Sequence, residues 1–379
     1  MYVAHKIEIK PNKFIQKQIS EAFGYSRYIY NKALVEWKRM YNLYKEDSSN
    51  PKPTNWKVRS NLKRNKLEWE STQQTQILDT SCDDLSKAFN MFFKGISKYP
   101  KFKSKKKSKN TCRFYRKNEY TIKIINDKYL KLPKLEPIKM KEKLRFKGII
   151  KEVTISKKAN KYFASFIIDS DIKVRPNTNG KFAGIDLGIK TFAVVTDSDN
   201  NYYEYESILN NLKPLYNKIS CYQRRLSKKN RYSNKYNVMK TKLQKIYLRI
   251  SNIQNDYLHK ITTELIQDYQ YITIEDLNVS GMLKNRKLSK VISRSLFYTF
   301  KIFLEYKAKM YNNTIIIADR WFPSSQTCSN CGNVLKKENK LKLSNRVYKC
   351  KKCDNIIDRD VNAAINLKLY GMHQVGLQP

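Results

Sequence analysis

The chain has 379 residues, and its 76 Lys and Arg against 33 Asp and Glu give a formal net charge of +43. Self-repulsion at this charge opposes compaction unless a polyanion binds, so nucleic acid is the expected partner. No run approaches the roughly 18 apolar residues that a membrane span needs, the start lacks the apolar block of a signal peptide, and the basic residues are not confined to one membrane-binding helix. We therefore expect no membrane partner and a soluble intracellular protein, located in the cytoplasm or nucleoid, or in the nucleus of a eukaryote.

The N-terminal part is predicted to contain a strand, two helical stretches and a lysine-rich loop. Residues 2–9 alternate like a strand, and apolar side chains recur at helical spacing over 14–46 and about 72–97. The loop over 98–110 and the basic and aromatic residues after it suit contacts with phosphates and bases, although a lysine run is also typical of a solvated loop. The candidate nucleic-acid-binding residues are Lys101, Lys103, Lys105, Lys106, Lys107, Arg113 and Arg116.

Short alternating runs follow this loop. They predict strands over 120–125, 128–132, 150–156 and 161–168, which we interpret as a small β-domain of barrel type. If the first strand of the chain joins this domain, then residues 11–110 are a helical insertion.

The second half has a different order of elements. Strands are predicted over 181–187, 191–196 and 201–206, followed by two long helices joined by a basic turn at 227–234. A strand at 271–276, a helix at about 291–311, a strand at 314–319 and a last helix near Asp360 complete it. This β-β-β-α-β-α-β-α order is that of an RNase H-like α/β domain, with an insertion between its last strand and its last helix.

Three acidic residues occupy the positions that an RNase H-like nuclease needs. Asp186 ends the first strand of this half, Glu275 ends the fourth, and Asp360 begins the last helix. Two Mg²⁺ ions ~3.5–4 Å apart need several carboxylate oxygens to orient an in-line attack on a phosphate, and Mg²⁺ prefers such hard ligands. The sequence therefore predicts a catalytic triad of acids that binds Mg²⁺.

Two of these positions have acidic competitors. Neighbours on a strand point to opposite faces, and Glu275 is favoured over Asp276 because it shares its face with Thr273 and not with the adjacent isoleucines. Asp358 competes with Asp360, and Asp360 could serve only as the N-cap of the last helix. The residues alone leave this second choice open.

Four of the seven cysteines form two tight pairs near the C-terminus. Cys328-x2-Cys331 and Cys350-x2-Cys353 have the spacing of a closed tetrahedral site of four thiolates. Two disulfides are the alternative, but paired cysteines in an intracellular protein are more typical of metal. We predict a structural zinc ion held by these four residues.

Several stretches together resemble the TnpB family, which comprises RNA-guided endonucleases encoded by insertion sequences and related to compact type V CRISPR effectors and Fanzor proteins. The resemblance spans nearly the whole chain and is densest over residues 180–370. The matching stretches are Tyr30–Leu34, Tyr99–Lys103, Gly184–Lys190, Ile274–Met282, Leu304–Ala308, Phe322–Gly332 and Asp358–Asn366.

The resemblance implies a set of domains and partners. It implies a wedge β-barrel over 1–10 and 111–178, interrupted by a helical recognition lobe over 11–110. It also implies a RuvC-like nuclease domain over 179–320 and 358–379, interrupted by a zinc ribbon over 321–357. Its expected partners are a guide RNA from the encoding element and a double-stranded DNA target beside a short adjacent motif. Family usage favours Asp360 over Asp358.

The resulting prediction is an Mg²⁺-dependent, RNA-guided DNA endonuclease. A nuclease-inactive RNA-guided repressor is the first alternative, and the complete acid triad disfavours it. A DDE-like transposase shares the RNase H-like fold and its acids, so it is disfavoured by the ribbon and the whole-chain resemblance. A junction nuclease that works without RNA would need neither the ribbon nor so large a basic N-terminal half.

Overall fold

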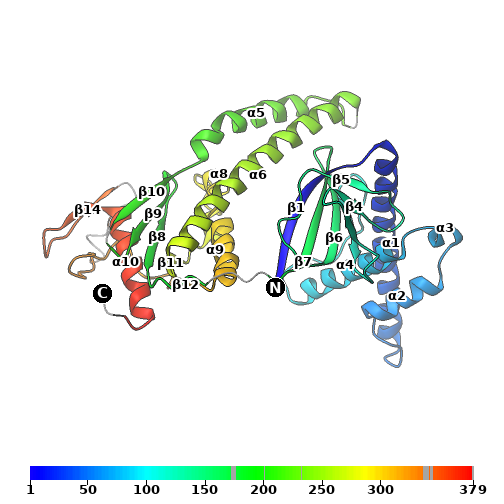
Figure 1. Cartoon of the computed structure of the whole chain (residues 1–379), viewed down its shortest axis with the longest axis horizontal. Helices are drawn as coiled ribbons and strands as arrows, with labels where there is room; N and C mark the ends of the chain where they lie inside the picture. Colours follow the sequence, from blue (N-terminus) through cyan, green and yellow to red (C-terminus); the bar gives the residue numbers. More distant parts are fainter. Residues whose placement is uncertain (172–175, 200, 232, 336–340, 342–344, 378–379) are drawn as a thin grey trace. The chain divides into compact units, whose positions relative to one another are not determined.

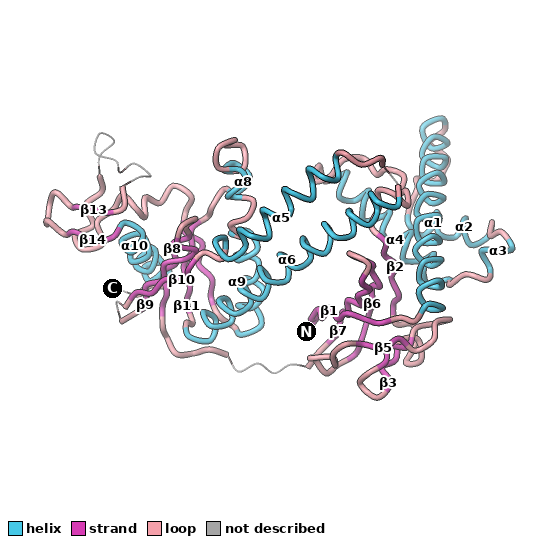
Figure 2. Tube along the Cα trace, turned by 90° about the horizontal axis from the view of Figure 1, so that it is seen from above, coloured by secondary structure: helices cyan, strands magenta, loops and turns pink. Residues whose placement is uncertain are grey.

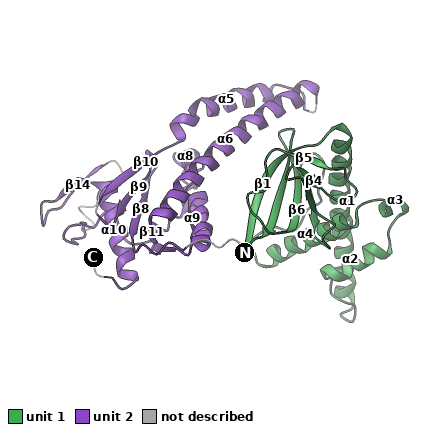
Figure 3. Cartoon of the chain, viewed as in Figure 1, with its two compact units in different colours: residues 1–172 green, residues 173–379 purple. Residues whose placement is uncertain are grey.

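A computed structural model describes residues 1–171, 176–199, 201–231, 233–335, 341 and 345–377. The chain divides into two compact units, residues 1–172 and 173–379 (Figure 3). None of the helices within the described ranges is both long and apolar enough to cross a membrane.

Unit 1 contains a seven-stranded sheet in the order β2-β6-β7-β1-β5-β4-β3. The first strand, β1 (Tyr2–Lys10), pairs antiparallel with β7 (Lys161–Asp169) and β5 (Ile138–Met140), so it joins the later strands as predicted. Pairing over residues 1–171 runs from β2 to β3 and does not close the sheet into the predicted barrel. The remaining strands are β2 (Asn110–Tyr115), β3 (Lys123–Ile125), β4 (Tyr129–Lys131) and β6 (Ile149–Lys158).

The helices of unit 1 lie between β1 and β2 in sequence. Helix α1 (Lys13–Glu46) begins at Asn12, whose side chain accepts a hydrogen bond from the backbone N–H of Ile15 at 2.8 Å. Its apolar stripe packs with α4 (Thr75–Phe93), and both helices contact β2 (Figure 1). The sequence missed α2 (Asn55–Arg64) and α3 (Glu68–Ser71), because they bury too few side chains to leave an apolar stripe.

Unit 2 contains a five-stranded sheet in the order β10-β9-β8-β11-β12. The first three strands in sequence pair antiparallel, whereas β11 pairs parallel with both β8 and β12. Along the chain the five strands follow one another as predicted, whereas their order within the sheet was not predicted. Their bounds are β8 (Phe182–Leu187), β9 (Thr191–Asp197), β10 (Tyr202–Glu206), β11 (Tyr271–Glu275) and β12 (Thr314–Ala318).

Helices cover both faces of this sheet (Figure 1). Helices α6 (Asn234–Asp268) and α9 (Phe297–Tyr311) pack on the face that carries Ile185 and Ile274. Helix α10 (Arg359–Gln374) packs on the opposite face, close against β8. A Cβ atom at Gly184 would lie 2.1 Å from the carbonyl oxygen of Ala364, so only glycine permits this approach.

The remaining elements of unit 2 lie outside this sandwich. Helix α5 (Leu209–Ser227) packs antiparallel along part of α6, and the tube view in Figure 2 shows the resulting hairpin. The short helices α7 (Val279–Met282) and α8 (Ser289–Ile292) precede α9, which begins later than predicted. The small hairpin of β13 (Val347–Lys349) and β14 (Ile356–Asp358) precedes α10.

Candidate active site

Asp186 lies near the end of β8, on the face of the sheet that α10 covers. Gly184 is two residues earlier on the same strand and contacts α10, so the alternation of side chains directs Asp186 to that face. Burial raises the pKa of Asp186 well above its usual range, and the negative charges of Glu275 and Asp360 raise it further. Three acids that are distant in sequence therefore lie close enough to interact electrostatically.

Glu275 and Asp276 are neighbours in sequence but have opposite environments. Thr273 lies on the α10 face, where its hydroxyl would meet a Cβ atom at Gly371, and Glu275 shares this face. Burial raises the pKa of Glu275, and the Ser324 hydroxyl, which donates to this carboxylate at 2.5 Å, opposes the rise.

Asp276 belongs to a different set of contacts. Its carboxylate binds Lys301, with 3.4 Å between Nζ and Oδ1, and Arg320. The hydrogen bond from Arg320 is the main cause that lowers the pKa of Asp276. The structure thus brings Glu275, and not Asp276, to Asp186, for the reason of strand alternation that the sequence indicated.

The start of α10 separates the roles of Asp358 and Asp360. Asp358 is the N-cap, because its Oδ1 accepts hydrogen bonds from the backbone N–H groups of Asp360 at 2.8 Å and Val361 at 3.2 Å. Asp360 is therefore not the cap, and its carboxylate is bound instead by Arg346 at 3.1 Å and Arg359 at 3.1 Å. Its negative charge also acts on Asp186 and Glu275.

Polar residues that the sequence did not single out hold this site together. The buried Asn366 on α10 donates to the carbonyl oxygens of Ser324 at 2.7 Å and Thr327 at 2.8 Å. Asn362, one turn earlier, donates to the Thr327 carbonyl at 2.7 Å. These bonds fix the loop that presents Ser324 to Glu275. Asn362 and Asn366 are four residues apart, so they lie on the same face of the helix, and this spacing was the only sequence signal for their role. Asparagines with this spacing are more often exposed polar residues.

The four paired cysteines form a second cluster in unit 2. The Sγ atoms of Cys328, Cys331, Cys350 and Cys353 all lie within 4.8 Å of one another, and this group could hold a metal ion. All four are free thiols, so the alternative of two disulfides is not present. Over the described ranges no other set of three His, Cys, Asp or Glu ligands is as close, so the acids are more loosely arranged than the thiols.

Comparisons with known proteins match most of the chain. Residues 165–286 match the OrfB_IS605 family model, described as "Probable transposase". A protein of Streptomyces pristinaespiralis named "Putative RNA-guided DNA endonuclease" is 31% identical over 385 residues, covering 97% of this chain and 89% of the relative. The chain belongs to the TnpB family.

Further matches extend along this TnpB-family chain. The Escherichia coli protein InsQ, which has the same descriptive name, is 27% identical over 97% of this chain and 92% of its own length. Residues 297–367 match a model described as "Cas12f1-like, TNB domain". A solved Cas12f1-sgRNA-target DNA complex aligns over 97% of this chain and 99% of its own chain at 16% identity, but its TM-score of 0.36 is too low to establish a shared fold.

A model described as "Helix-turn-helix domain" matches residues 1–46. In this TnpB-family chain that region is the strand β1 followed by the single long helix α1. The structure therefore shows no helix-turn-helix over these 46 residues, all of which it describes.

The predicted nucleic-acid contacts of this TnpB-family chain lie in unit 1. Asn31 holds the loop at Lys103 through two hydrogen bonds of 2.7 and 2.9 Å. Lys103 itself is partly buried, with its Nζ 3.6 Å from the centre of the Tyr30 ring. The other loop lysines are exposed: Lys101, Lys105, Lys106 and Lys107.

The two predicted arginines differ from these lysines. Arg113 is 14% exposed and pairs with Asp84 at 2.8 Å and Glu152 at 3.2 Å, so its charge is already neutralised within the unit. Arg116 is 27% exposed and lies 3.8 Å from Glu119. The role of all seven residues in binding nucleic acid stays a prediction, and for Arg113 the contacts favour a role in stabilising unit 1.

Proposed function

We propose that the chain is an RNA-guided DNA endonuclease in which Asp186, Glu275 and Asp360 are the catalytic acids. The observation that carries the proposal is the convergence of three acids from β8, β11 and α10: burial raises the pKa of Asp186 and of Glu275, and the charge of Asp360 raises both further. A fold gains no stability from gathering like charges, so their convergence points to a ligand that is positively charged. The names of the relatives, which cover nearly the whole chain, supply the substrate class and the guide.

The donor set fits Mg²⁺. Carboxylate oxygens are the hard ligands that this ion prefers, and Asp186, on which the charges of both other acids act, would hold the ions together with Glu275 and Asp360. When bound, the ions would supply an activated water and stabilise the leaving oxygen. The Ser324 hydroxyl orients Glu275, and α10 carries Asp360.

The wider architecture is part of the proposal. The sheet of unit 2 has the order β10-β9-β8-β11-β12, with β11 parallel to β8. This arrangement supports an RNase H-like domain of RuvC type. The four thiols support a structural zinc ion, because zinc favours four sulfur ligands in a closed site. The wedge and recognition functions of unit 1, and the six segments predicted above, belong to the same proposal.

Co-expression with the flanking genomic DNA tests this function. The RNA that copurifies would be sequenced, and the complex would be offered a library of matching plasmids with Mg²⁺, beside an Asp186→Ala control. Cleavage of matched plasmids, absent in the control, is the expected result. Bound RNA without cleavage would instead indicate a repressor. Absence of any specific RNA would favour the transposase that the family description names.

A further inference from the structure

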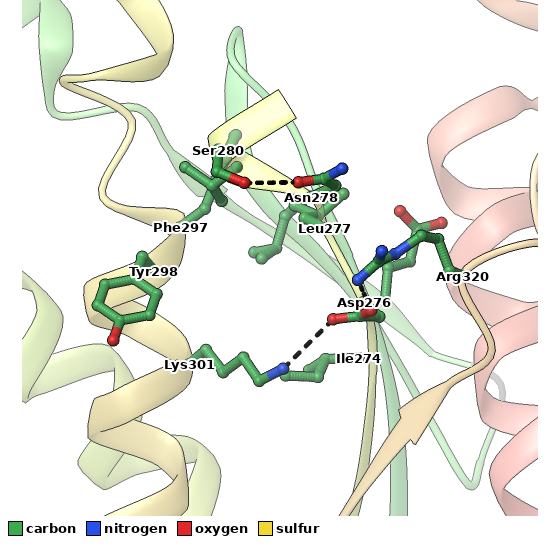
Figure 4. A pocket seen from close by; sticks show the side chains of 12 residues that line it. Ile274, Asp276, Leu277, Asn278, Ser280, Phe297, Tyr298, Lys301 and Arg320 are labelled. Atoms are coloured by element: carbon green, nitrogen blue, oxygen red, sulfur yellow. Dashed lines mark hydrogen bonds and ion pairs between the residues drawn. The ribbon is translucent and has the colours of Figure 1, made fainter. Parts of the chain in front are cut away.

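A groove of about 310 Å³ opens beside the acid cluster in unit 2 (Figure 4). Glu275 is one of its lining residues, so the groove borders the proposed catalytic site. Asp276, Phe297, Tyr298 and Lys301 also line it. Its volume is at the lower end of the roughly 300–1,000 Å³ that small-ligand clefts occupy, a size suited to a single nucleotide.

Two cations in the groove share one carboxylate. Lys301 comes from α9 and Arg320 follows β12, and Figure 4 shows both reaching Asp276 between them. Two positive charges against this one carboxylate leave a local net charge of about +1, and Glu275 adds a second carboxylate to the groove as a whole. Lys301 is 29% exposed and Arg320 is 48% exposed. The guanidinium has five N–H donors, so those not bound to Asp276 can bind a phosphate.

The groove also has aromatic and apolar lining residues, and Tyr298 lies one turn before Lys301 on α9 (Figure 4). Phe297 is buried and fixes the start of α9, whereas the adjacent Tyr298 is 65% exposed. Ile274 and Leu277 complete the apolar lining. An exposed aromatic ring above an apolar surface is what a nucleic-acid base stacks on, and such stacking is tolerant of base identity.

We propose that this groove, called here the nucleotide groove, binds one nucleotide of the DNA strand that is being cut, next to the scissile phosphate. Lys301 and Arg320 contact its phosphate, and Tyr298 stacks on its base. Asp276 is a positioning residue that holds the two cations in place. The inference rests on the proposed function, because the bound strand is the substrate only if Glu275, which lines the groove, is a catalytic acid.

Photo-crosslinking tests where the strand lies, independently of cleavage. A single 5-iododeoxyuridine would be moved along each strand of the target, in complexes of the guide RNA with the Asp186→Ala chain. We expect a crosslink to the peptide containing Phe297 and Tyr298 from positions within one or two nucleotides of the cut made by the unsubstituted complex. Crosslinks to this peptide only from positions far from the cut, or none from either DNA strand, would overturn the inference.

Cleavage kinetics supply the second test. A target opened in advance by a mismatched bubble removes the unwinding step, and the cleavage rate is measured against complex concentration. The double variant Lys301→Ala, Arg320→Ala should raise the half-saturating concentration about tenfold, while the rate at saturation stays within a few-fold. Lys309→Ala is the control, since it removes an exposed lysine from the same helix outside the groove. Unchanged half-saturation in the double variant would contradict the proposed phosphate contacts.

Variants of Tyr298 test the groove even if the Lys301 and Arg320 double variant misfolds. The Tyr298 side chain is exposed, so replacing it should have little effect on stability. Tyr298→Ala should weaken half-saturation about fivefold, whereas Tyr298→Phe, which retains the ring, should match the unsubstituted chain. Equal behaviour of both variants would exclude stacking. If the unsubstituted complex neither cuts nor gives RNA-dependent crosslinks, the proposed function fails, whereas cutting without any effect of the groove variants rejects the groove alone.

Discussion

The acid cluster and the four-cysteine cluster of unit 2 are assembled in different ways. The cysteines lie within residues 328–353, so two local turns bring them together. The acids come from β8, β11 and α10, so they meet only once the sheet has formed and α10 has docked on it. A structural metal site of this kind can therefore be identified from the close spacing of its ligands in the sequence. The acid site can be identified only once the order of the strands is known.

The two clusters are nevertheless connected through one loop. Asn362 and Asn366 bind the segment that runs from Ser324, which contacts Glu275, to Cys328 of the cysteine cluster. Loss of the cysteine cluster should therefore disturb the acids, while loss of an acid should leave the cysteines intact. The predictions below test this asymmetry.

The largest effect is expected from Asp360→Asn, compared with its matched neighbour Asp358→Asn. Removing the charge of a catalytic acid should lower the rate of DNA cleavage on the order of a thousandfold or more. Asp358→Asn should leave the rate within a few-fold, because asparagine is as good an N-cap as aspartate. Measured zinc content should be the same in both variants. An equal loss of cleavage in Asp358→Asn would show that the start of α10 has been misassigned.

A smaller loss is expected from Cys328→Ser. Elemental analysis should find about one zinc ion per unsubstituted chain and none in this variant. The cleavage rate of the variant should fall roughly ten- to hundredfold, because the loop that holds Ser324 against Glu275 loosens. Cys221→Ser, which alters a single cysteine on α5, is the control. Retention of full activity in a zinc-free Cys328→Ser chain would break the proposed connection between the clusters.

The dependence of Mg²⁺ affinity on pH should distinguish the acids from the surrounding surface. The pKa values of Asp186 and Glu275 are raised, so protons compete with the metal more strongly than at ordinary carboxylates. The half-saturating Mg²⁺ concentration for cleavage should fall as the pH is raised from about 6 to about 8. A half-saturating concentration that does not change over this range would indicate acids that are already fully ionised.

The smallest expected effect is on stability without divalent ions. Because the folded-state pKa of Asp186 is raised, its ionised form destabilises the fold, and this penalty is full above that pKa and shrinks as the pH falls below it. Asp186→Asn should therefore stabilise the metal-free chain by about 1 kcal/mol, or a rise of about 2–4 °C in Tm at neutral pH. The gain should shrink at acidic pH. A variant less stable than the unsubstituted chain would contradict the repulsion among these buried acids.

Much of unit 2 could be predicted because its sequence is periodic. Alternation along β11 placed Glu275 with Thr273 and away from Ile274, and the structure has this arrangement. The choice between Asp358 and Asp360 could not be made from the residues, because either could cap a helix. It depends on which carboxylate accepts from the backbone of α10, a property of the folded turn.

Other features had no sequence signal. The strands β2 and β5 were missed because β2 looked like a basic and aromatic binding segment and β5 has only three residues. Arg113 looked like a phosphate ligand until the fold brought Asp84 and Glu152 to it. Contacts of this kind join residues far apart in the chain, so only the tertiary structure reveals them.

The most direct test of the central claim is anomalous scattering from crystals of the guide RNA and DNA complex soaked in Mn²⁺, a stand-in for Mg²⁺. The account predicts manganese peaks between the carboxylates of Asp186, Glu275 and Asp360, and a zinc peak among the four cysteines as an internal standard. A zinc peak without manganese at the acids, in crystals that hold the substrate strand, would contradict the assignment of these acids as the catalytic site.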